Sequence, residues 1–426
     1  MGPPPPSPPQ ASGDGATSNP TTSGPTTTTT TTTTTSPSPD KPPPAAPPFP
    51  PTNRDDNNNH QKSLKAKKKE KPRPWGMAST FKALVSSAKK LAIGDSGSKA
   101  ALDELFPAVT PEIDGDDCDH DCASCSVSYP KNFKIDEDDE LYGFVKGWST
   151  HVLVATGKTD WVRDVADEKG SVMQAIAAQK GPSNGRLMLS ASNIPTPHHT
   201  SSYSEPTTVL LLPAFVVVEN VTPATVPTLI EGLINKAPTN ASPLVPVSLP
   251  RELEAPLPEA SPAAIRELTT RPSPHRALIL LCSQKTRDAR CGQSAPLLRK
   301  ELQRHLAPLG LYRDLDDERP GGVGIYFISH VGGHKYSANM MVYRRRDAFG
   351  VDGVERAKVG DEKVVLVKNQ EEEGEDVGAA QCIWLARVRP EDCEGIVKFT
   401  VLQGKVVKPA RQLRGGFDRG KGVMSW

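Results

Sequence analysis

"RALILLCSQKTRDARCGQSAPLLRKEL", residues 276–302, begins with an unbroken apolar run and ends in a helix-forming pattern. A short apolar run bounded by polar residues is typical of a buried strand. The helical pattern starts at Ser294 and ends at Gly310, which suits a helix C-cap. Cys282 ends the predicted strand and Cys291 lies just ahead of the predicted helix. The stretch therefore predicts a strand–turn–helix unit of an α/β fold.

The sequence after this unit continues the same alternation. Further strands are expected at 322–329, 338–345 and 382–388, and a closing helix at 390–401 with Pro390 in its first turn. These elements predict an α/β domain over residues 274–405.

An earlier part of the chain has a similar order of elements. Strands are expected at 151–157, 186–192 and 207–221, and helices at 168–179 and 225–237. The segment 152–176 also echoes 278–302, because both run strand, Lys-Thr turn, Arg-Asp pair, glycine, serine and helix. We therefore predict an amino-terminal α/β domain, residues 116–243, of related fold. The turn of this amino-terminal copy holds no cysteine, so the copy has no counterpart of Cys282 and Cys291.

The remaining segments differ in composition from these two domains. Residues 1–76 are rich in proline and threonine and have almost no apolar residues that could form a core, so a disordered leader is expected. The other expected segments are a linker with a short amphipathic helix at 77–115, a proline-rich linker at 244–273 and a flexible tail at 406–426.

Four side chains of the second domain form a candidate metal site. Cys282 and Cys291 flank one polar loop, and His330 and His334 follow the strand at 322–329. Side chains at the same end of neighbouring strands can converge. Two chemistries fit two thiolates and two imidazoles, namely tetrahedral zinc and a [2Fe–2S] cluster. Two glycines separate the histidines, so a turn is more plausible than helical stacking.

Several motifs carry a family resemblance. They are LCSQKTRDARCGQSAPLL, LGLYRD, SHVGGHKYSANMMVYRR, CIWLARV, CDHDC and STHVLVATGKTDWVRDV, all within residues 116–400. They closely resemble the sucrase/ferredoxin-like family, including its fungal members. The resemblance implies a carboxyl-terminal thioredoxin-like ferredoxin domain. It also implies a [2Fe–2S] cluster held by Cys282, Cys291, His330 and His334.

Three further cysteines, Cys118, Cys122 and Cys125, lie close together in CDHDCASC. A zinc knuckle with His120, a redox pair of Cys122 and Cys125, and free thiols are all compatible with this spacing. The spacing does not choose between them.

The final tripeptide, Met424-Ser425-Trp426, resembles the carboxyl-terminal signal by which the cytosolic iron–sulfur assembly machinery recognises its clients. It favours a cytoplasmic protein. A mitochondrial location is the alternative if translation starts at Met77, because residues 77–94 look like a short presequence.

Net charge and hydropathy exclude two classes of partner. The formal net charge is +1, so no overall basic field favours nucleic acid. The longest apolar stretch, 209–218, is about half the roughly 20 residues that a membrane helix needs. The expected function is electron transfer or redox sensing with unknown donor and acceptor, and the sequence favours a non-enzymatic protein over an enzyme without deciding between them. The family resemblance implies a role in redox or oxidative-stress homeostasis. The alternatives are a zinc-stabilised interaction protein and a thiol-disulfide oxidoreductase.

Overall fold

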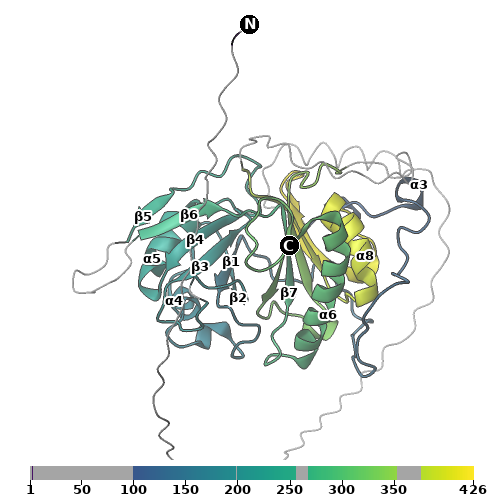
Figure 1. Ribbon diagram of the computed structural model, residues 1–426, viewed down its shortest axis with the longest axis horizontal. Coiled ribbons are helices and arrows are strands. Elements are labelled where there is room, and N and C mark those ends of the chain that lie inside the picture. Colours follow the sequence, from purple (N-terminus) through teal and green to yellow (C-terminus); the bar gives the residue numbers. More distant parts are fainter. Residues whose placement is uncertain (1, 3–98, 198, 256–266, 353–375) are drawn as a thin grey trace, which may run out of the picture. The chain divides into compact units, whose positions relative to one another are not determined.

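The computed structural model describes residue 2 and residues 99–197, 199–255, 267–352 and 376–426. The predicted leader, apart from Gly2, and the amphipathic helix predicted after Met77 lie outside the described residues. From Lys99 onward the described chain belongs to one compact unit built on a 13-stranded mixed sheet (Figure 1). Among the described helices, none has the length and apolarity to cross a membrane.

The first half of the sheet is built from residues 150–236. Strands β1 and β2 are parallel, β3 runs antiparallel to β1, and β4 runs antiparallel to β3. A helical run follows β4. The bounds are β1 Thr150–Ala155, 3-10 turn Val165–Asp167, α4 Val172–Ala178, β2 Leu187–Ser192, β3 Thr207–Leu212, β4 Val216–Val221, 3-10 turn Pro223–Thr225, α5 Val226–Thr228, π-helical turn Leu229–Leu233 and 3-10 turn Ile234–Lys236.

The second half repeats this plan. Strands β7 and β9 are parallel, β10 runs antiparallel to β7, and β11 runs antiparallel to β10. The bounds are β7 Ala277–Cys282, α6 Ala289–Leu306, 3-10 turn Ala307–Leu309, β8 Tyr312–Arg313, β9 Val323–Ile328, 3-10 turn His334–Tyr336, β10 Met340–Arg345, β11 Ala379–Leu385, 3-10 turn Pro390–Asp392, α8 Cys393–Gly395 and π-helical turn Ile396–Val401. The predicted strands and closing helix are confirmed.

The two halves are related by their strand order. One half reads β2-β1-β3-β4 and the other β9-β7-β10-β11, and the halves meet where β2 pairs antiparallel with β9. The prediction that the halves share a related α/β fold is therefore confirmed. The thioredoxin-like label of the second half stays a prediction.

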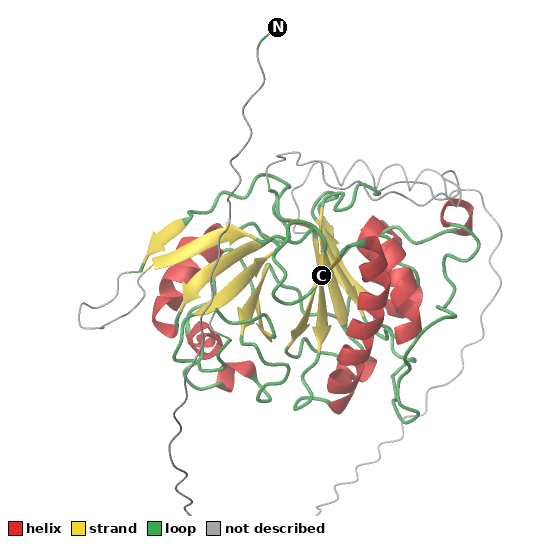
Figure 2. Ribbon diagram, viewed as in Figure 1, coloured by secondary structure: helices red, strands yellow, loops and turns green. Residues whose placement is uncertain are grey.

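Alternating side chains divide the core into layers. In β1, Val152 and Val154 pack in the core beneath α4, whereas Leu153 packs in another core. In β7, Ile279 packs beneath α6, and Leu280 joins Leu153 in the second core. Helices thus cover the outer faces of both halves (Figure 2). The inner faces share one apolar core.

Two segments that were predicted to lack regular structure pair with the sheet. Within the predicted linker 244–273, β5 (Glu252–Glu254) and β6 (Glu267–Pro272) extend the sheet beyond β4. The tail predicted at 406–426 contains α9 (Pro409–Gln412), β12 (Leu413–Asp418) and β13 (Val423–Met424), and β12 pairs with β11.

The prediction of a flexible tail was wrong because the glycines of this segment allow the backbone to pack closely. Gly416 has a φ of +145°, and a Cβ there would collide with the carbonyl oxygen of Cys382 on β11. Leu413 and Phe417 are buried on either side of it. The RGGFD sequence is therefore a close-packed strand.

The segment before β1 packs on the second half of the fold. It contains α2 (Leu102–Leu105) and α3 (Pro111–Asp114). Phe106 is buried in the core beneath α6. The hydroxyl of Tyr129 donates a hydrogen bond to the carbonyl of Val388 at 2.7 Å. Residues 116–147, predicted as the start of the amino-terminal domain, therefore contact the carboxyl-terminal one.

Candidate metal centre

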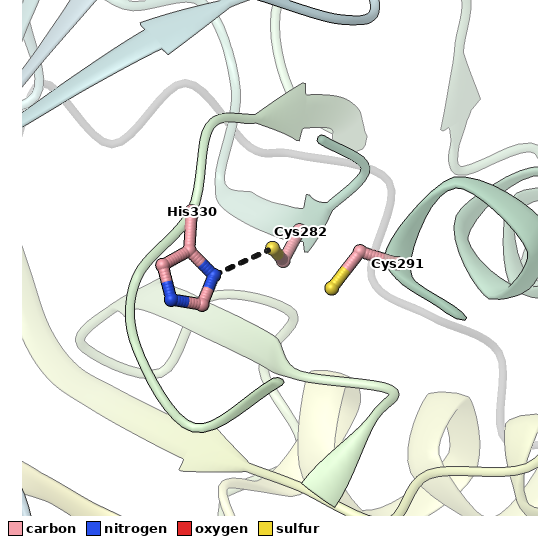
Figure 3. Close-up of side chains that lie close together, drawn as sticks. All are labelled: Cys282, Cys291 and His330. Atoms are coloured by element: carbon pink, nitrogen blue, oxygen red, sulfur yellow. Dashed lines mark hydrogen bonds between the residues drawn. The ribbon is translucent and has the colours of Figure 1, made fainter. Parts of the chain in front are cut away.

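The two cysteines and the first histidine of the predicted site converge. Cys282 is the last residue of β7, and it pairs in register with Ile328 at the end of the parallel strand β9. His330 follows two residues later. The ligand atoms of Cys282, Cys291 and His330 all lie within 4.8 Å of one another (Figure 3). Cys291 lies inside the first turn of α6 and not ahead of the helix as predicted.

The fourth predicted ligand, His334, lies beside this group. The ring centroids of His330 and His334 are 5.2 Å apart, but the ligand atoms of His334 are not among those within 4.8 Å. Its Nδ1 is buried and has no hydrogen-bond partner among the described residues, and its Nε2 is 3.9 Å from a carboxylate oxygen of Asp288. A buried nitrogen that lacks a partner is costly. This nitrogen is therefore available to a ligand.

The histidine loop is shaped by its two glycines. Gly332 and Gly333 have φ angles of +87° and +64°, which side chains other than glycine rarely adopt. The predicted turn is confirmed and helical stacking is excluded. A Cβ at Gly333 would meet the guanidinium of Arg414 at 2.5 Å.

Arg414, on β12, holds this loop in place through hydrogen bonds. Its Nη1 donates to the carbonyl of Gly332 and to Oδ1 of Asn339, both at 2.9 Å. Asn339 in turn donates to the carbonyl of Gly333 at 3.0 Å. The guanidinium also lies over the ring of Trp384, 4.4 Å from its centroid. Burial lowers the pKa of Arg414 to about 10, a value at which it remains cationic at neutral pH.

Hydrogen bonding between Cys282 and Cys291 shifts the pKa values of their thiols in opposite directions. The hydrogen bond from Cys282, followed by those from His330 and Ser337, lowers the pKa of Cys291 to about 5. The same pairing with Cys291, together with burial, raises the pKa of Cys282. The pairing therefore favours ionisation of Cys291 over ionisation of Cys282. Metal ligation requires deprotonated thiols, so a bound cation would favour the second deprotonation.

Comparison with known proteins places this site in a family. The family model described as sucrase/ferredoxin-like matches residues 141–415, which contain both halves of the repeat. The chain belongs to the sucrase/ferredoxin-like family.

Two proteins from yeasts are similar to this chain. The chain is 29% identical over 245 residues to actin patches distal protein 1 of Saccharomyces cerevisiae, covering 54% of this chain and 71% of that protein. It is 30% identical over 134 residues to altered inheritance of mitochondria protein 32 of Clavispora lusitaniae, covering 32% of this chain and 33% of that protein. The chain thus spans about a third of the latter relative. No solved structure matches.

The sequence did not predict the residues of this chain that hydrogen-bond or position the four candidate ligands. Gln284 accepts a hydrogen bond from the backbone N–H of His330 at 2.8 Å, and Ser337 lies 3.4 Å from the thiol of Cys291. Asp288 is the N-cap of α6, and a carboxylate just before a helix was a usable signal for that role. Arg414 gave no such signal.

The other predicted thiol site is not assembled as a zinc knuckle. Cys118, Cys122 and Cys125 do not form a common ligand group in the described part of the chain, and His120 is mostly exposed beside Asp119. All three cysteines are free thiols. Cys122 instead groups with His305 and Glu394, residues distant in sequence.

Proposed function

We propose that this protein is an iron–sulfur redox protein that binds a [2Fe–2S] cluster through Cys282, Cys291, His330 and His334. The observation that carries the proposal is the convergence of two buried thiols and one imidazole at the carboxyl ends of β7 and β9. The buried, unpartnered Nδ1 of His334 supplies a fourth donor next to them. Thiolate and imidazole donors in equal number fit such a cluster.

The bound cluster would supply one-electron transfer. The protein's part is to hold the donors: Gln284 fixes the backbone of His330, and Asp288 faces Nε2 of His334. Neutral imidazoles in place of thiolates leave less negative charge around a cluster, which favours uptake of an electron. Family membership supports a role in redox homeostasis, with electron transfer rather than catalysis as the activity.

A zinc-stabilised interaction protein is the competing function, because zinc accepts the same donors. Metal analysis separates the two. In the full chain purified from its host cells, we expect about two irons and two acid-labile sulfides per chain and an EPR signal after dithionite reduction. Cys282→Ala, His330→Ala and His334→Ala should each lower the iron content at least tenfold, or alter the EPR signal, because each removes a donor.

The matched control is Cys382→Ala. Cys382 is buried in β11 beside Tyr343 and is not part of the ligand group. Its removal should leave iron and sulfide unchanged. Circular dichroism establishes that each variant is folded. Stoichiometric zinc without iron in the wild type would reject the cluster and favour the interaction protein.

The carboxyl-terminal tripeptide has a packing role that sequence reasoning did not expect. The ring of Trp426 lies 4.3 Å from that of Trp148, and Ser425 is fully buried with its hydroxyl accepting from the N–H of Gly416 at 2.9 Å. We nevertheless propose that Met424, Ser425 and Trp426 also serve as an assembly signal in the cytosol.

Deleting Trp426 tests both roles of the tripeptide. If it is a signal, the variant from cells should contain less than half of the wild-type iron, and chemical reconstitution should restore the cluster to the folded protein. A packing role alone predicts a variant that unfolds with about 2 kcal/mol less free energy, because aromatic burial is lost, but that still acquires its cluster in cells. Normal iron in cells would reject the signal.

A further inference from the structure

A second group of reactive side chains lies at the opposite end of α6 from Cys291. The hydrogen bonds that anchor the loop carrying Cys122 include two from backbone N–H groups. The N–H of Cys122 donates to the carbonyl of Glu391 at 2.9 Å, and the N–H of Ser126 donates to the carboxylate of Glu301 at 3.0 Å. This geometry fixes the CASC sequence, residues 122–125, against the helix.

The guanidinium of Arg304 lies beside Cys122 and His305. Nη2 of Arg304 lies 3.4 Å from the sulfur of Cys122 and 3.0 Å from Nε2 of His305. Cys122, His305 and Glu394 could otherwise hold a metal ion, since their ligand atoms lie within 4.8 Å. The guanidinium also donates to the carboxylate of Glu301 at 2.8 Å, and this contact holds its Nη2 beside the sulfur as a cationic hydrogen-bond donor. A cationic donor binds a thiolate more strongly than a thiol.

The partner thiol is three residues away. The N–H of Cys125 donates to the carbonyl of Cys122 at 3.4 Å, which closes a turn. The first and last Cα atoms of such a turn are less than about 7 Å apart, within reach of a disulfide. Cys125 is partly exposed, and the side chain of Arg304 beside Cys122 is 34% exposed. Cys122 itself is only 8% exposed, so an oxidant has to be as small as hydrogen peroxide to reach its sulfur.

We propose that Cys122 and Cys125 form a second redox centre, a dithiol that a hydroperoxide oxidises to an intramolecular disulfide. The thiolate of Cys122 attacks the terminal peroxide oxygen, the O–O bond breaks, and an alcohol or water leaves with a proton. The sulfenic acid then formed on Cys122 is attacked by the thiol of Cys125. The S–S bond forms as the S–O bond breaks, and water leaves. The two thiols lose two electrons and the peroxide gains them.

Peptide mapping tests the proposal in the full chain. Lys99 and Lys131 are consecutive tryptic sites, so one peptide, 100–131, holds Cys118, Cys122 and Cys125. In a Cys118→Ser background this peptide contains only the two proposed cysteines. Treatment with hydrogen peroxide followed by alkylation should give a peptide that has lost two hydrogens and carries no alkyl group. Dithiothreitol should reverse the change.

Arg304→Gln should slow disulfide formation roughly tenfold, because one charge-assisted hydrogen bond to the sulfur is lost. The matched control is Arg299→Gln on the same helix, since Arg299 pairs with Asp314 and not with the thiols. Equal rates in both variants would overturn the role of Arg304. Two results would overturn the redox centre. One is alkylation of both cysteines after peroxide treatment, and the other is zinc that is bound to the wild-type protein and is lost in the His305→Ala variant. The peptide measurement of the disulfide does not depend on the [2Fe–2S] cluster.

Discussion

Arg414→Met is expected to abolish cluster binding and to lower the free energy of unfolding by about 3 kcal/mol. The reason is local: Arg414 donates to the part-buried carbonyl of Gly332 and to the buried side chain of Asn339, and a methionine leaves both acceptors without this donor. The glycine turn then loses the support that places His330 and His334. We expect iron content at least tenfold below the wild type, measured together with urea unfolding.

The control for this prediction is Arg419→Met. Arg419 is equally buried on the same carboxyl-terminal segment, but it donates to the backbone carbonyls of Ser242, Pro243, Val377 and Ala379, which are not at the site. This variant should lose stability and keep its iron. If both variants lose iron equally, general destabilisation explains the effect and the specific support by Arg414 is wrong.

Local sequence signals accounted for most of the elements around the site. The apolar run before Cys282 and the one before His330 predicted β7 and β9, because each is short, continuous and bounded by polar residues. Gly310 ends the helical region with a φ of +69°, as expected for a C-cap. The convergence of Cys282, Cys291 and His330 follows from this order, since parallel neighbours end at the same edge.

The features that sequence reasoning missed depend on contacts between distant segments. Arg414 lies more than eighty residues from the histidine loop that it supports, and Arg304 lies 182 residues from Cys122. No local periodicity reports such pairs. The glycines of β12 were misread for a related reason: Gly416 suits a flexible chain and a close backbone approach equally well, and only the neighbouring strand distinguishes them.

Two buried histidines make the stability of the fold depend on pH. His151 on β1 hydrogen-bonds Tyr343 and Ser190 at 3.0 and 2.9 Å, and burial lowers its pKa to about 3. Burial, with a smaller contribution from Arg313, lowers the pKa of His275 to about 4. Both are neutral in the folded protein at pH 5, whereas in the unfolded chain they bind protons below about pH 6.5.

The stability that these histidines contribute is therefore complete above pH 6.5 and is lost as the pH falls toward their folded pKa values. Each protonation difference is worth about 1.4 kcal/mol per pH unit, so about 4 kcal/mol should be lost between pH 8 and pH 5. Urea unfolding across this range measures it. His151→Gln and His275→Gln should each remove about half of the loss, because glutamine does not titrate. A loss as large in either variant as in the wild type would assign the pH dependence to other groups.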